Sequence, residues 1–146
     1  MDLPVCREIT NACPTSDDTV VLDYEARFLR RKILTCESGF RFMVDFAKTT
    51  SVYQDQTFVL EDERKIGIIP AKEELLQITG ELAKFAWHIG NRHAPCQIER
   101  HRLLIQKNHV IKGMLDGLGA SVTSVNEPFE PERGAYGLGR AHGHAH

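Results

Sequence analysis

The sequence predicts an α+β chain: a small all-β domain, then a ferredoxin-like βαββαβ domain, then a flexible tail that carries histidines. Three observations predict this order. Apolar residues alternate with polar ones up to about residue 71, and after that they recur at helical spacing. Beyond residue 126 the chain holds two prolines and four glycines and ends in three alternating histidines. We therefore expect a loose leader at 1–18, the β domain at 19–71, the ferredoxin-like domain at 72–126 and the tail at 127–146.

The β domain is predicted from alternation and from turns. Over 40–46, three phenylalanines and a valine occupy every second position, which is the pattern of a strand with one buried face. Residues 37–39 predict a turn before this strand. Residues 62–64 predict another turn, which joins a strand at 57–61 to a strand at 65–71. Several short strands joined by close turns favour a compact sandwich or a small barrel.

The second domain is predicted from two helices and the strands around them. Apolar residues of the first helix follow the spacing i, i+3, i+4, i+7, with Gly90 expected just after its end. Asn108 is the expected N-cap of the second helix, which should end before Gly119. Strands are expected at 74–79, 96–98, 103–106 and 121–125, which gives the order βαββαβ.

Composition excludes several classes of protein. A formal net charge of −2 gives no broad attraction to nucleic acid or to anionic membranes. No apolar run approaches the ~18 residues of a membrane span, and the first ten residues do not resemble a signal peptide. The four cysteines form no CxxC pair, which argues against a zinc ribbon. Without a secretion signal they favour a reducing cytoplasm: Cys6, Cys13, Cys36 and Cys96.

The histidines carry the chemistry. All seven lie in the second half of the chain. Three of them, His142, His144 and His146, alternate at the C-terminus, where i and i+2 side chains can converge on one ion. Neutral imidazole suits zinc, copper and nickel. The alternative interpretation is a solvated tail or an expression tag.

His93 is the more specific candidate. It follows the first helix and precedes Pro95, so it should lie on an exposed turn beside the partial negative charge of the helix end. One histidine cannot hold a metal tightly, but a two-fold dimer with His93 near its axis would bring two imidazoles together. The tail histidines could then complete the coordination. The alternative is a surface histidine with no role.

The remaining candidates are weaker. His88 lies in an apolar segment beside Trp87, where packing or a buried hydrogen bond is expected rather than metal ligation. His109 is the probable first residue of the second helix and is either a peripheral ligand or merely exposed. Cys96 follows His93 by three residues and could share its ion, although a small apolar role is the commoner one. His101 is read as a hairpin residue without function.

Enzyme signatures are missing. The chain has no HExxH, no GxSxG and no phosphate-binding glycine loop. Two rivals to a metal carrier remain open. One is a small zinc hydrolase that uses His93, His109 and Cys96, and it lacks an evident carboxylate base. The other is a protein-interaction adaptor in which the histidines are incidental.

A set of motifs resembles the UreE family, the nickel metallochaperones of urease maturation. The match covers most of residues 72–136 in the right order, with the histidine tail as a further hallmark, and it is weaker over 19–71. The motifs are Gly90-Asn91-Arg92-His93 with Pro95, then Asn108-His109-Val110-Ile111 with Met114-Leu115 and Leu118-Gly119, then Pro128-Phe129-Glu130-Pro131-Glu132 followed by Gly134-Ala135-Tyr136.

The resemblance implies a non-enzymatic protein that captures Ni²⁺ and delivers it to apo-urease, with Zn²⁺ or Cu²⁺ as competitors. It implies a β domain that binds partner proteins or peptides and a metal domain that forms a homodimer. His93 would supply a metal ligand from both subunits, and His142, His144 and His146 would add further ligands. The implied partners are the urease apoprotein and its accessory proteins, including the UreG GTPase.

Two departures qualify this expectation. Some members have a histidine two positions before His109, where this chain has Lys107, so the resemblance does not imply a peripheral site built on that pair. The tail has three histidines where some members have many, which favours carriage of one or two ions over storage. Imidazole must be unprotonated to bind metal, so affinity should fall as the pH drops through the ordinary histidine pKa of ~6.5.

Overall fold

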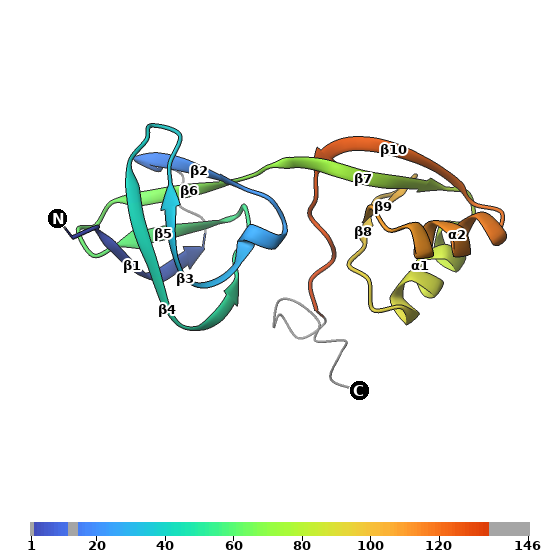
Figure 1. Cartoon of the computed structure of the whole chain (residues 1–146), viewed down its shortest axis with the longest axis horizontal. Coiled ribbons are helices and arrows are strands. Elements are labelled where there is room, and N and C mark those ends of the chain that lie inside the picture. The colour runs from blue at the N-terminus through green and yellow to red at the C-terminus, as the bar shows by residue number, and fades with distance from the viewer. Residues whose placement is uncertain (1, 12–14, 135–146) are drawn as a thin grey trace. The chain divides into compact units, whose positions relative to one another are not determined.

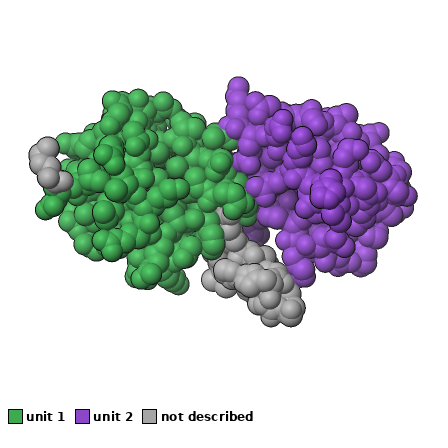
Figure 2. All heavy atoms as spheres, viewed as in Figure 1, with its two compact units in different colours: residues 1–71 green, residues 72–146 purple. Residues whose placement is uncertain are grey.

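The computed structural model describes residues 2–11 and 15–134 and divides into two compact units, residues 1–71 and residues 72–146 (Figure 2). The first unit is all strand apart from one short 3-10 turn, and the second has a sheet with helices (Figure 1). The predicted α+β class is confirmed. Within the described residues, no helix is both long enough and apolar enough to cross a membrane.

The first unit is one curled six-stranded sheet with the order β2-β6-β5-β1-β4-β3. The predicted strands at 40–46, 57–61 and 65–71 are confirmed with shifted ends. The elements are β1 (Val5–Asn11), β2 (Asp18–Leu22), η1 (Glu25–Arg27), β3 (Phe28–Thr35), β4 (Arg41–Ser51), β5 (Gln56–Leu60) and β6 (Lys65–Pro70).

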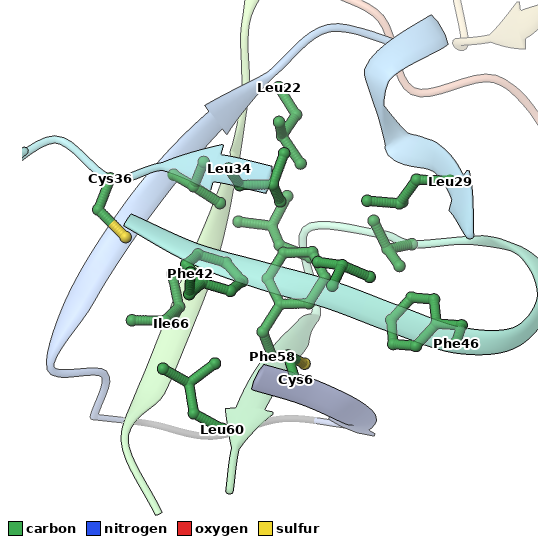
Figure 3. Packing of buried hydrophobic residues seen from close by; sticks show 14 residues of the cluster. Cys6, Leu22, Leu29, Leu34, Cys36, Phe42, Phe46, Phe58, Leu60 and Ile66 are labelled. Atoms are coloured by element: carbon green, nitrogen blue, oxygen red, sulfur yellow. The ribbon is translucent and has the colours of Figure 1, made fainter. Parts of the chain in front are cut away.

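Alternation places the core of this unit on one side of the sheet. Phe42, Val44 and Phe46 of β4 are buried, while Arg41 on the same strand is exposed. Phe58 of β5 packs against Phe42, with ring centroids 5.5 Å apart (Figure 3). A fully buried side chain of this size contributes about 1.5–3 kcal/mol relative to an exposed one. The aromatic residues are therefore a main source of this unit's stability.

The expectation of a loose leader at 1–18 is wrong. Residues Val5–Asn11 form β1, which pairs in parallel with β4 and antiparallel with β5, inside the sheet. The register shifts between Cys6 and Glu8, which interrupts the period-2 pattern that would have revealed a strand. Hydrogen bonds on both edges stabilise β1, so it needs few apolar residues of its own.

The second unit follows the order β7–α1–β8–β9–α2–β10, with the strand order β10-β7-β9-β8. Figure 1 shows both helices on one side of this sheet, and one apolar cluster contains residues of both helices and of the sheet. The elements are β7 (Lys72–Thr79), α1 (Leu82–Asn91), β8 (Gln97–Ile98), β9 (Leu103–Gln106), α2 (His109–Gly117) and β10 (Ser121–Pro128).

Both predicted helices are present, and both end in a Schellman motif. At the end of α2 the N–H of Gly119 donates to Asp116 O (3.1 Å) and that of Ala120 donates to Leu115 O (3.0 Å). Gly119 has a φ of 85°, the left-handed conformation that this motif requires. At its start, Asn108 Oδ1 accepts from the N–H groups of Val110 and Ile111, so the predicted N-cap is confirmed.

The expectation that a flexible tail begins at residue 127 is also wrong, because residues 127–132 are bound to the second unit. Glu127 lies in β10, and Phe129 after it is fully buried. The N–H of Glu130 donates to Gln97 Oε1, and that of Glu132 donates to Cys96 O, both at 2.8 Å. The segment after β10 is thus bound along β8, the opposite edge strand. The sequence pattern did not predict this binding, because the segment is rich in proline and glutamate and its hydrogen bonds are donated by backbone N–H groups, which every residue except proline has.

Candidate metal centre

His93 lies immediately after α1 in a left-handed turn. The helix ends at Asn91, and His93 follows the C-cap Arg92 with a φ of 56°. Its N–H donates to Gly90 O at 3.0 Å, and the N–H of Ala94 donates to Ile89 O at 3.4 Å. These are the two hydrogen bonds of a Schellman motif, with His93 at its left-handed position. The expectation that Gly90 follows the helix is therefore wrong, because the helix continues to Asn91 before the motif closes.

A side chain in the left-handed conformation is unusual. This conformation costs a non-glycine residue about 1–2 kcal/mol, which is why glycine or asparagine normally occupies the position. Of the residues that the structure describes, only Glu63 and His93 combine a side chain with a positive φ. The turn holds the His93 side chain exposed at the end of α1. A strained, exposed residue capable of binding metal is a reason to infer function.

Next to this turn, α1 exposes an aromatic residue. Trp87 is 64% exposed, whereas Phe85 and Ile89 of the same helix are buried. The Trp87 ring stands edge-on to the His88 ring, with centroids 5.0 Å apart and an interplanar angle of 90°. The packing role expected for His88 therefore takes the form of a ring contact with Trp87.

The described residues hold no assembled three-ligand metal site. Over residues 2–11 and 15–134, no three histidine, cysteine, aspartate or glutamate side chains are grouped so that they could share a metal ion. The hydrolase alternative built on His93, His109 and Cys96 thus has no assembled site in this part of the chain. The remaining predicted ligands, His142, His144 and His146, lie outside the described residues.

Cys96 is a poor candidate ligand. It is half-buried after the His93 turn, and its Sγ lies 3.9 Å from Gln97 O. Burial, with a smaller contribution from the nearby Glu132 carboxylate, raises the pKa of the Cys96 thiol to about 11. Because the thiolate is the form that binds metal, a raised pKa weakens binding at neutral pH.

His109 occupies a different place from His93. It is the first residue of α2, it is exposed, and it lines a pocket together with Lys107 and Lys112. Two ammonium groups beside it disfavour a cation there. His101 is exposed in the turn between β8 and β9, as the sequence predicted.

Two features of the site were missed from the sequence. The spacing of the buried residues of α1 already places Trp87 off the buried face, so its exposure could have been predicted. The left-handed turn at His93 could not have been found in this way, because histidine is not a residue that normally signals it.

Comparison with known proteins agrees with the motifs. The family profile described as "UreE urease accessory protein, C-terminal domain" matches residues 73–146, and the profile of the N-terminal domain matches residues 3–69. The urease accessory protein UreE of Ruegeria pomeroyi is 56% identical, over the full length of both chains. That of Rhodobacter capsulatus is 54% identical over 88% of this chain and 83% of its own. The chain therefore belongs to the UreE family of urease accessory proteins.

Proposed function

We propose that this chain is a nickel metallochaperone that captures Ni²⁺ at a site shared between two subunits and delivers it to apo-urease. The single observation that carries the proposal is His93, held exposed in a left-handed turn at the end of α1. One imidazole by itself binds a metal ion weakly. Two copies related by a two-fold axis would supply two, because such an interface presents every residue twice.

The outer surface of the helices supports a homodimer. Trp87 of α1 is 64% exposed, which is high for a large apolar side chain. Gly90, Gly113 and Gly117 lie in the same two helices, and a Cβ added at any of them would meet nothing within 4 Å. Each helical glycine costs about 1 kcal/mol relative to alanine. Close packing of a second subunit against these glycines would explain why larger residues are absent there.

We further propose that the tail histidines His142, His144 and His146 complete the coordination, and that a partner which displaces the tail releases the ion. Nickel is the cargo, and exchange of ligands is the whole of the chemistry. The ferredoxin-like domain would carry the site, and the β domain would bind the urease apoprotein, UreG or other accessory proteins. Zn²⁺ and Cu²⁺ would compete for the same imidazoles. The free thiols Cys6, Cys36 and Cys96 suit a reducing cytoplasm as the compartment.

His109 stays a predicted peripheral ligand outside this core site. The lysines that line its pocket disfavour a dication, so we expect any nickel there to be weak.

The test is a nickel titration of tag-free protein by calorimetry, with molar mass followed by light scattering. We expect one tight ion per two chains, lost in His93→Ala while the dimer persists. His101→Ala is the matched control, because His101 is also exposed in a turn of the second unit. Parent-like binding by His93→Ala would overturn the central assignment. Weak binding confined to the tail would instead favour a protein-interaction adaptor.

A further inference from the structure

A pocket of about 440 Å³ opens at the start of α2, away from the His93 turn in the sequence. All the residues that line it belong to the second unit. Its volume lies in the range of ligand-binding pockets in proteins. The lining includes Leu76, Lys107, Val110, Lys112 and Ser124.

Two of the lining residues form a cross-strand pair. Leu76 of β7 and Ser124 of β10 are register partners, and Leu76 belongs to the apolar cluster between the helices and the sheet. Val110 lines the pocket from α2 and is 50% exposed. A leucine-sized side chain inserted here would remove the apolar surface of Val110 from water, which is favourable by the hydrophobic effect.

The charged residues of the lining are of one sign. Among the described residues, Lys107 and Lys112 line the pocket and no carboxylate does. Their carboxylate partners are Glu74, 3.5 Å from Lys107 Nζ, and Asp116, 2.9 Å from Lys112 Nζ. Both pairs are exposed, and exposed pairs are weak enough for a lysine to exchange one carboxylate for another. The positive end of the α2 dipole adds to the attraction for an anion.

We propose that this pocket is a docking site for an extended segment of a partner protein, in which one apolar side chain is flanked by acidic residues. The apolar side chain enters between Leu76 and Val110, and the flanking carboxylates pair with Lys107 and Lys112. The backbone N–H groups of Val110 and Ile111 donate to Asn108 Oδ1 and are therefore not available to the carboxylates of the segment. The two lysines are the groups that recognise its negative charge. This inference goes beyond the proposed nickel function and does not depend on it.

The test is an NMR titration of the ¹⁵N-labelled full chain, in chelator and without metal, with the peptide acetyl-Glu-Glu-Leu-Glu-Glu-amide. We expect saturable shifts of the amides of Val110, Lys112 and Ser124. Two control peptides, with glutamine or lysine in place of glutamate, should bind at least about fivefold more weakly, because they lose or reverse the charge complementarity. Equal binding of the glutamine peptide would overturn charge recognition, and no shifts at millimolar peptide would overturn the site.

The matched variants separate charge from folding. The double variant Lys107→Glu/Lys112→Glu should weaken binding of the acidic peptide by at least about tenfold, because two attractions become repulsions. Lys84→Glu is the control, since Lys84 also makes an exposed ion pair, with Glu81, but does not line the pocket. If the reversal variant loses its native spectrum, Lys107→Gln/Lys112→Gln is used and should show a smaller loss. Unchanged affinity in a folded variant would refute the proposal. Because metal is absent throughout, failure here is distinct from failure of the nickel assignment.

Discussion

His93 occupies at the end of α1 the same left-handed position that Gly119 occupies at the end of α2, with φ angles of 56° and 85°. In each case the N–H of this residue and that of the next one close a Schellman motif onto the last helical turn. Glycine adopts this conformation without steric cost, and histidine does not. The two helix ends are therefore equivalent in backbone geometry, and only the first presents an imidazole.

The first prediction separates the stability of this turn from its function. His93→Gly should raise the free energy of unfolding by up to about 1 kcal/mol, because relief of the left-handed strain is partly offset by the entropy of glycine in the unfolded chain. The same variant should lose tight nickel binding. Urea denaturation and calorimetry measure the two effects, with His101→Gly as a control that gains no stability. A variant that is clearly destabilised would show that the turn is not strained.

A second prediction concerns the surface beside His93. Trp87→Glu should shift the molar mass from dimer to monomer at micromolar concentration, because it places a charge in the proposed apolar interface. Tight nickel binding should fall with it, since the site needs two copies of His93. The control is Val21→Glu, which also replaces an exposed apolar residue but lies in the first unit. A stable dimer of Trp87→Glu would exclude this surface as the interface.

A third prediction concerns the tail. Deletion of residues 141–146 should lower the stoichiometry or the affinity of nickel binding without changing the thermal unfolding temperature. The reason is that three candidate imidazoles are removed, while the described core clusters involve no residue beyond 122. Calorimetry and differential scanning fluorimetry measure the two quantities. Replacement of the three tail histidines by asparagine should reproduce the deletion, and unchanged binding in both would leave the tail without a role.

A fourth prediction concerns Cys96. Cys96→Ser should leave nickel affinity at pH 7 unchanged within about twofold, because burial keeps the thiol protonated and a protonated thiol is not a ligand. A calorimetric titration of the variant beside the parent measures this. A sulfur-to-nickel charge-transfer band in the parent, absent from the variant, would contradict the prediction.

A fifth prediction concerns the ion pair between Arg102 and Glu127. Both guanidinium nitrogens Nη1 and Nη2 donate to the Glu127 carboxylate at 2.7 Å, and Nε donates to Glu99 at 2.9 Å. Hydrogen bonding to Arg102 lowers the pKa of Glu127. A lowered pKa means that the folded state favours the ionised carboxylate, so the stabilisation is present at neutral pH and is lost as the pH falls through the acidic range.

We expect Glu127→Gln to reduce the free energy of unfolding at pH 7 by about 1 kcal/mol or less, because both side chains are partly exposed and water screens the pair. The difference between parent and variant should be smaller at pH 3 than at pH 7, because protonation of the parent carboxylate increases as the pH falls. Urea denaturation at both pH values measures it, and Glu74→Gln, from an exposed pair, is the control. A difference that grows on acidification would have the wrong sign.

Much of the fold could be predicted from local patterns. The alternation over 40–46 predicted β4 because one face of that strand is buried. A strand buried on one face has apolar residues at every second position, which can be recognised from the sequence. The side chain of Asn108 stabilises the start of α2 locally, so that N-cap could also be read without knowledge of the rest of the chain. The order of histidine-containing motifs was sufficient to indicate the family.

The structure decided what depends on distant partners. The strand β1 exists because β4 and β5 supply hydrogen bonds on both its edges, and Phe129 is buried because the segment after it binds Gln97 and Cys96. Lys107 and Lys112 acquire a common pocket only when Leu76 and Ser124 are brought beneath them by strand pairing. The sequence by itself determined which residues could bind a metal. It also placed His93 on an exposed turn. The structure added the left-handed backbone of His93, which is closed by hydrogen bonds to Gly90 and Ile89 and which no residue type there signals. Tertiary structure decided that Cys96 is partly buried, because burial arises from packing between segments far apart in the chain.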